Sequence, residues 1–245
     1  MNSYEVWVRR TLGVLRTQRI SVSGLNFIPK TGAGVLAPNH LNWKDVFFLS
    51  ALIPRQIHYV GTYELFDNKK CCEYVTDYIL QRFGRGVKIP AKFLGSRLAG
   101  IISHRIKAVG AVPVKRGGST KKMFESVKDS LRNGKLVCLF PEGGTGMVGK
   151  LKKFKKGLSK IVYDLWEEGY ERIPVFPASI KGTNKFFLPK RHLSLKIGLP
   201  LHIEDYLEKS PRETLVRFTE HLWQAVYNLL FDDKELNHGF ANKSS

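Results

Sequence analysis

The stretch Gly34-Val-Leu-Ala-Pro-Asn-His-Leu-Asn-Trp-Lys-Asp45 decides the fold, because it joins a short apolar run to a polar turn and the start of a helix. Residues 34–37 are typical of a buried strand. Residues 46–49, Val-Phe-Phe-Leu, continue as the apolar face of a helix. A buried strand that leads through a polar turn into a helix is the unit from which parallel sheets are built. In such sheets the chemistry collects beyond the carboxyl ends of the strands, so the turn at His40 is a candidate site.

The same unit recurs along the chain. Further apolar runs of strand length stand at 57–61, 109–114, 136–140, 173–176 and 193–197. Segments of helix length lie between or after them, at 43–53, 73–83, 92–107, 120–132, 154–168 and 211–231. Strands that alternate with helices predict an α/β fold, with a mostly parallel central sheet flanked by helices on both faces. No linker rich in Ser, Gly or Pro divides the core, so we expect a single domain.

The two ends of the chain differ from this core. Residues 4–16 place their apolar and aromatic side chains on one face of a helix, with Arg9, Arg10 and Arg16 outside that face. This pattern predicts an amphipathic, membrane-associating helix within residues 1–20, although a terminal helix docked on the core would show the same pattern. We expect the α/β domain to span 21–233 and a flexible tail to occupy 234–245.

The charge of the chain demands an anionic partner. Its 245 residues carry 40 Lys and Arg against 21 Asp and Glu, a formal net charge of +19, and 43% hydrophobic residues suffice for a sizeable core. An anionic membrane surface fits this charge, and so does nucleic acid, but the sequence has no zinc-finger spacing or RNP-like motif. We therefore expect a membrane partner and no nucleic acid. With no apolar run of about 18 residues, no secretory signal and only three cysteines, we expect a peripheral protein on the cytoplasmic face.

His40 and Asp45 have the residue types of a general-base pair. His40 falls on the turn, Asn42 is a good helix N-cap, and Asp45 stands near the first turn of the helix, where a carboxylate is stabilised. Such a carboxylate can orient the imidazole and stabilise it when it accepts a proton. In isolation, the same spacing fits a capping box beside an ordinary loop histidine. No HExxH pair or cluster of His with Cys occurs, so we expect no metal.

A glycine-rich stretch, Pro141-Glu-Gly-Gly-Thr-Gly-Met-Val-Gly-Lys150, resembles two nucleotide motifs at once. The phosphate loop requires Ser or Thr after its lysine, but Leu151 stands there. The dinucleotide fingerprint should open a helix directly after its strand, but Pro141 and Glu142 intervene. A nucleotide-dependent enzyme that uses residues 143–150 therefore stays an alternative function. A basic lipid-binding or nucleic-acid-binding module without catalysis is another.

Taken together and in order, four segments resemble the glycerolipid acyltransferase family, whose best-known members are the 1-acyl-glycerol-3-phosphate acyltransferases. Asn39-His-Leu-Asn-Trp-Lys-Asp45 is similar to the family's NHxxxxD block, and Phe140-Pro-Glu-Gly143 to its FPEG block. Gly110-Ala-Val-Pro-Val-Lys-Arg116 and Ile173-Pro-Val-Phe-Pro177 resemble the second and fourth blocks. The resemblance runs from about residue 22 to about residue 200.

The resemblance implies a role for each candidate residue. His40 and Asp45 would be catalytic, because His40 would remove the proton from an acceptor hydroxyl that then attacks an acyl thioester. The implied substrate-binding residues are Arg116, Lys115, Glu142, Gly143 and Pro177. The implied acceptor is a lysophospholipid, most simply 1-acyl-glycerol-3-phosphate giving phosphatidate. The implied donor is acyl-CoA or an acyl carrier protein, and the reaction requires no cofactor.

Two departures from the family pattern concern the acceptor and the surface. Gly144-Thr-Gly146 stands where the family often has Thr-Arg-Ser, so one expected cation is absent. The segment between Phe66 and Gly110 is about twenty residues longer than in the common family pattern, and it carries much of the excess positive charge. We expect this insertion to contact lipid or the donor.

Overall fold

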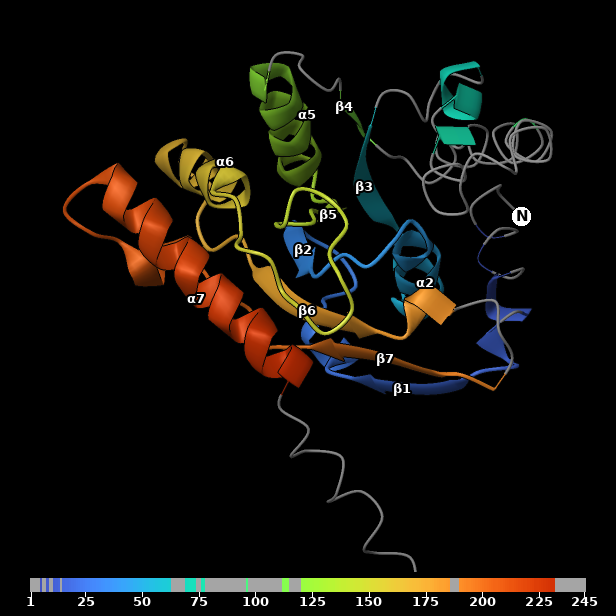
Figure 1. Cartoon of the computed structure of the whole chain (residues 1–245). Helices are drawn as coiled ribbons and strands as arrows, with labels where there is room; N and C mark the ends of the chain where they lie inside the picture. The colour runs from blue at the N-terminus through green and yellow to red at the C-terminus, as the bar shows by residue number, and fades with distance from the viewer. Residues whose placement is uncertain are drawn as a thin grey trace, which may run out of the picture.

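The structure is a computed structural model. It describes residues 15–62, 120–185 and 190–231 without a break, together with 5, 8, 11–13, 69–73, 76–77, 96 and 112–114. The strands of this part form one seven-stranded sheet in the order β1-β7-β6-β2-β5-β3-β4 (Figure 1). Their bounds are Arg19–Ser23 for β1, Gly34–Pro38 for β2, Ile57–Thr62 for β3, Val112–Val114 for β4, Leu136–Cys138 for β5, Val175–Lys181 for β6 and His192–Ile197 for β7.

The sheet is mostly parallel, as the alternation of strands and helices predicted. Strands β6, β2, β5, β3 and β4 run in one direction, and β7 pairs antiparallel with β6. Strand β1, which the sequence did not predict, pairs parallel with β7 and forms the edge of the sheet. Because β2, β5 and β6 are parallel neighbours, their carboxyl ends lie at the same edge of the sheet.

Helices cover both faces of the sheet. The described α-helices of the domain are α2 (Lys44–Leu52), α5 (Thr120–Arg132), α6 (Gly157–Glu167) and α7 (Pro211–Phe231), joined by the short 3₁₀ turns η1 (Leu25–Phe27), η4 (Thr183–Lys185) and η5 (Ile203–Tyr206). In Figure 1, α5, α6 and α7 lie on one side of the sheet and α2 lies on the other. The α/β fold with both faces covered is therefore confirmed.

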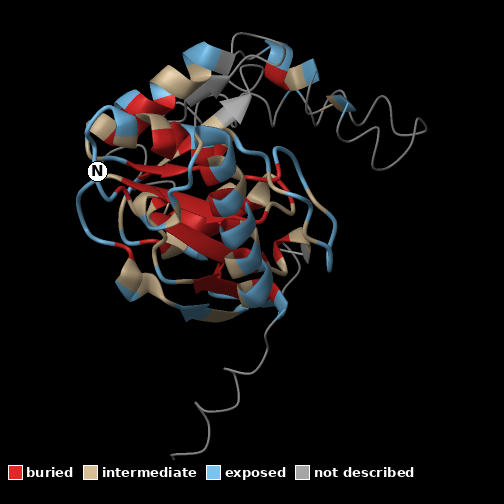
Figure 2. Cartoon of the chain, turned by 90° about the vertical axis from the view of Figure 1, so that its left-hand side faces the viewer, coloured by how far each residue is buried: buried red, intermediate tan, exposed pale blue. Residues whose placement is uncertain are grey.

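Strand β2 shows how one strand supplies both cores. Each of its five residues is buried, which explains its unbroken apolar run. Leu36 packs with Phe48 of α2 in one apolar cluster, while Val35 packs with Phe218 of α7 in the other. Full burial of such a side chain contributes about 1.5–3 kcal/mol. Figure 2 shows the same division, with buried strands in the middle and exposed outer faces on the helices that cover them.

The predicted helices at 73–83 and 92–107 and the tail at 234–245 lie almost entirely outside the described residues. Only parts of the N-terminal segment are described. There Leu15 is buried in the cluster around α2, and Val8 packs against that cluster. The boundaries 1–20, 21–233 and 234–245 stay predictions. No helix in the described part of the chain is long and apolar enough to cross a bilayer.

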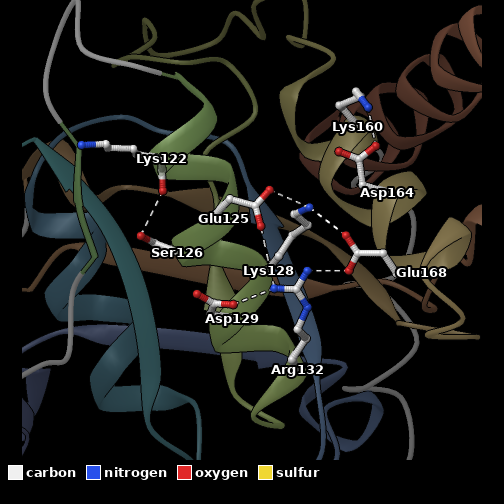
Figure 3. A network of polar contacts seen from close by, with 9 residues as sticks. All are labelled: Lys122, Glu125, Ser126, Lys128, Asp129, Arg132, Lys160, Asp164 and Glu168. Carbon is white, nitrogen blue, oxygen red and sulfur yellow. Dashed lines mark hydrogen bonds and ion pairs between the residues drawn. The ribbon is translucent and has the colours of Figure 1, made fainter.

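An ion-pair network joins α5 to the end of α6 (Figure 3). Lys128 of α5 lies 2.9 Å from Oε1 of Glu168 and 2.8 Å from Glu125, and only 7% of its side chain is exposed. Arg132 donates to the other oxygen of Glu168. These two hydrogen bonds hold the pKa of Glu168 below its usual value. The network fixes the helix pair that covers β5 and β2.

Replacing Glu168 by Gln should lower the free energy of unfolding by about 1 kcal/mol at neutral pH, because the mostly buried Lys128 loses one of its two charged partners and Arg132 also loses an ion pair. Since the folded-state pKa of Glu168 is lowered, its contribution is full above the unfolded-state pKa and is lost as pH falls through the folded-state value. Denaturant unfolding of both proteins across this pH range should show the difference shrinking in acid. The exposed Glu171→Gln serves as the control and should show no such difference.

Candidate active site

The candidate site is built where β2 ends. Beyond Pro38, the side chain of Asn39 takes over the pairing with β6. Its Nδ2 donates to the carbonyl of Ile180 at 3.1 Å, and its Oδ1 accepts the amide of Ile180 at 2.6 Å. By bonding both the N–H and the C=O of Ile180, the Asn39 side chain extends the hydrogen-bond pattern between β2 and β6. The turn that follows therefore starts from a fixed position.

The turn brings His40 and Asp45 together, as their spacing predicted. His40 Nδ1 lies 2.8 Å from Asp45 Oδ2. Helix α2 begins at Lys44, with Trp43 in the N-cap position, and the side chain of Asn42 accepts the Lys44 amide at 2.8 Å. The helix thus starts one residue later than expected, and Asn42 caps its first amide from the position before the N-cap.

Asp45 is fully buried, and its carboxylate accepts hydrogen bonds from four groups. Oδ2 accepts the backbone amides of Leu41 and Asn42, at 2.7 and 2.9 Å, in addition to its contact with His40. Oδ1 accepts the hydroxyl of Thr183 at 2.5 Å. A carboxyl group that accepts at both oxygens is present as the carboxylate, so His40 must carry its proton on Nδ1. The opposite ring nitrogen, Nε2, is then left as the proton acceptor.

Thr183 is the site residue that sequence reasoning missed. It follows β6 in the turn η4, 138 residues after Asp45 in the chain. Gly182 makes this turn possible, because its φ is +85° and a Cβ there would lie 2.2 Å from the carbonyl oxygen of His192. The glycine after an apolar run was the one local signal that the chain turns sharply here.

Glu142 holds the backbone of His40. It is buried, and its Oε1 accepts the His40 amide at 2.8 Å, while its Oε2 accepts the Lys152 amide at 3.2 Å. The carboxylate thus fastens the loop between β5 and α6 to the turn after β2. The structure therefore brings His40, Asp45 and Glu142 together. Contact of Glu142 with an acceptor stays a proposal.

The glycines of the loop allow this close approach. Gly146 donates its amide to the His40 carbonyl at 2.6 Å, and a Cβ there would lie 2.7 Å from Glu142 Oε2. Gly143 has a φ of +69°, and a Cβ there would lie 2.6 Å from the side chain of Lys155. The segment 143–150 forms a hairpin that turns back, and α6 begins only at Gly157. This geometry does not match the strand-to-helix turn of a nucleotide-binding motif.

The imidazole of His40 lies between a covered face and solvent. The ring of Phe140 stacks on it, with centroids 3.9 Å apart and planes 21° apart, and 16% of the His40 side chain is exposed. Burial, together with the charge of Asp45, raises the pKa of the Cys138 thiol in β5 well above the usual value. Cys138 therefore stays a thiol and is a poor nucleophile.

Three further residues were predicted to bind substrate. Pro177 is buried in β6 opposite Ala37 of β2, and its Cγ would lie 3.1 Å from a Cβ at Gly198. Lys115 and Arg116 lie outside the described residues. They directly follow Val114, the last residue of β4. The roles of these three residues stay proposals.

Comparisons with known proteins find acyltransferases. A family model described as acyltransferase matches residues 74–181, which include Glu142 and Pro177 but begin after Asp45. The 1-acyl-sn-glycerol-3-phosphate acyltransferase of Bacillus subtilis strain 168 is 27% identical over 205 residues, which cover 82% of this chain and 83% of that protein. The solved structure of the 1-acyl-sn-glycerophosphate acyltransferase PlsC from Thermotoga maritima shares the fold, with a TM-score of 0.57 and 18% identity over 95% of this chain and 79% of that chain.

The α/β fold carries a histidine–carboxylate pair at the carboxyl ends of its strands, and such a pair can activate a hydroxyl group. The family model and the curated relative support an O-acyltransferase, and the chain is similar to the glycerolipid acyltransferases. This similarity agrees with the resemblance that the ordered blocks of sequence indicated.

Gly146→Ala should lower the turnover number about ten- to hundredfold, because its methyl group would displace Glu142 or the His40 backbone. The neighbouring Gly144→Ala is a matched control, since nothing lies within 4 Å of a Cβ at that position. Steady-state kinetics of the two variants make the comparison. Equal turnover numbers would mean that the contact between the loop and His40 does not matter for catalysis.

Thr183→Val should leave Asp45 Oδ1 without its donor, a loss of roughly 1–3 kcal/mol in the free energy of unfolding. We expect turnover to fall about tenfold as the carboxylate loses its fixed orientation. Thr183→Ser keeps the hydroxyl and should restore most of both quantities. If Ser and Val behave alike, the hydroxyl has no role and only the volume of the side chain counts.

Proposed function

We propose that this enzyme transfers a fatty acyl group from a thioester to the free hydroxyl of a lysophospholipid, with 1-acyl-sn-glycerol-3-phosphate as the acceptor and phosphatidate as the product. The observation that carries the proposal is the 2.8 Å contact between His40 Nδ1 and Asp45 Oδ2. It leaves Nε2 of a partly exposed imidazole to accept a proton. The acceptor specificity follows the name of the curated relative from Bacillus subtilis.

The acyl group passes directly from the thioester to the acceptor, with no acyl-enzyme intermediate. His40 Nε2 takes the proton of the acceptor hydroxyl while the hydroxyl oxygen bonds to the acyl carbon. The bond between that carbon and the thioester sulfur then breaks, and the proton passes from the imidazolium to the leaving thiolate. Asp45 stabilises the imidazolium in between, which is how a positioned base contributes about 10²–10⁴-fold to a rate.

The remaining site residues serve binding in this proposal. Arg116 suits the acceptor phosphate, because a guanidinium offers a planar fork of donors, and Lys115 adds a second charge. Glu142 and Gly143 shape the loop beside the acceptor, and Pro177 lies near the acyl group. The donor is acyl-CoA or an acyl carrier protein, both of which are anionic.

The enzyme works as a peripheral protein at the cytoplasmic face of a membrane. Its net charge of +19 attracts anionic lipid, with about 1 kcal/mol for each basic residue close to the surface. Leu15 and Val8 of the amphipathic segment within residues 1–20 pack against the domain, so attachment by this segment depends on the other apolar side chains of its face.

His40→Ala should lower transfer by at least about a hundredfold and leave the fold intact, because the bonds of Glu142 and Gly146 to residue 40 use only its backbone. The measurement uses labelled palmitoyl thioester, on CoA and on a carrier protein, with a panel of lysophospholipids that do or do not carry a terminal phosphate. Circular dichroism and melting temperature report folding.

Near wild-type turnover of a folded His40→Ala protein would overturn the mechanism. Equal rates on acceptors with and without a terminal phosphate would overturn the proposed acceptor while leaving the mechanism in place.

A further inference from the structure

The loop between β5 and α6 exposes two apolar side chains at its tip, which we define as Met147–Lys150. The Lys150 amide donates to the Met147 carbonyl at 3.2 Å, and Gly149 at the third position has a φ of +78°. These are the features of a tight β-turn with glycine at its third position. At this turn Met147 is 62% exposed and Val148 is 66% exposed.

The exposure is fixed by the way the loop is held. Glu142, which precedes the tip, bonds the amide of Lys152, which follows it, and the amide of His40 in the turn after β2. The Lys152 ammonium donates to the Thr145 carbonyl at 2.7 Å, and the indole of Trp223 on α7 donates to the Lys152 carbonyl at 3.0 Å. Because both arms of the loop are tied down, the tip projects from a rigid base.

The surroundings of the tip are exclusively basic along the chain. No Asp or Glu stands between Glu142 and Asp164. Five exposed lysines follow Gly149, namely Lys150, Lys152, Lys153, Lys155 and Lys156. An exposed apolar pair followed by a run of exposed lysines matches a bilayer surface, where acyl chains accept the apolar groups and lipid phosphates attract the cations. An acidic protein partner would satisfy the lysines but would not require a projecting apolar pair.

We propose that the tip inserts Met147 and Val148 into an anionic lipid surface and so holds the catalytic base at the depth of its lipid substrate. Gly146, directly before Met147, donates to the His40 carbonyl, so a backbone hydrogen bond links the residue next to the tip to the base. The inference rests on the proposed function, because a lysophospholipid acceptor resides in the lipid surface. It adds a second lipid contact to that of the N-terminal segment.

The test is sedimentation of the full chain with vesicles of phosphatidylcholine that contain phosphatidylglycerol. Replacing both tip residues, Met147→Gln with Val148→Asn, should lower vesicle affinity at least about tenfold. Tyr170→Gln is the matched control, since Tyr170 is 42% exposed and precedes β6 at the opposite edge of the sheet. Its affinity should equal that of the wild type.

A second arm tests the lysines. Lys150→Gln with Lys153→Gln should lower affinity for the anionic vesicles about fivefold for each charge removed and should not affect binding to pure phosphatidylcholine. With a short-chain acceptor dispersed as monomers, the tip variant should transfer acyl groups at the wild-type rate.

Unchanged vesicle affinity of the tip variant would overturn the proposal, as would an equal loss in Tyr170→Gln. A tip variant that keeps its vesicle affinity but loses affinity for an acyl carrier protein would show that the tip docks the donor instead. If the wild type binds vesicles through the tip but acylates no lysophospholipid, the proposed function fails and the lipid contact stands.

Discussion

The buried carboxylate of Asp45 is the constraint on which the site depends. Removing a charge from water is costly unless donors surround it, and here two backbone amides, one hydroxyl and one imidazole do so. These donors come from the turn after β2 and from the turn after β6. The carboxylate therefore fixes the imidazole and joins two strand ends with one set of bonds.

Glu142 is a second buried carboxylate that fixes His40, in this case through the backbone amide. Where Asp45 orients the ring of His40, Glu142 fixes its amide and ties it to the loop after β5. The base is thus held from three neighbouring strands, β2, β5 and β6, at the edge where their carboxyl ends meet. A rate that depends on the position of one proton acceptor requires this kind of preorganisation.

The sequence predicted the parts of this arrangement that are local. The apolar run at 34–37, the spacing of His40 and Asp45, and the ordered blocks identified the fold class and the pair, because each rests on neighbours in the chain. The sequence could not predict Thr183, since its partner is distant and a threonine after a strand has no distinctive pattern. Edge strand β1 was not predicted because Arg19–Ser23 is mostly exposed and has only two apolar residues, so it lacks the apolar run that identified the other strands.

Strand β6 extends past its predicted end for a related reason. The predicted strand at 173–176 ends just before Pro177, but β6 continues to Lys181. Gly198 donates to the Pro177 carbonyl, and the pairing with β7 starts at Ala178, so the amide that proline lacks falls where the ladder ends. The pairing with β7, which the sequence does not show, explains why a proline is tolerated at this position.

The most direct test of the account is the tautomer of His40, measured by nitrogen-15 NMR of the labelled imidazole. The account predicts that neutral His40 carries its proton on Nδ1, and that Asp45→Asn abolishes this preference while the chain stays folded. A wild-type ring protonated on Nε2 would contradict it, because the nitrogen that should accept the substrate proton would already be occupied.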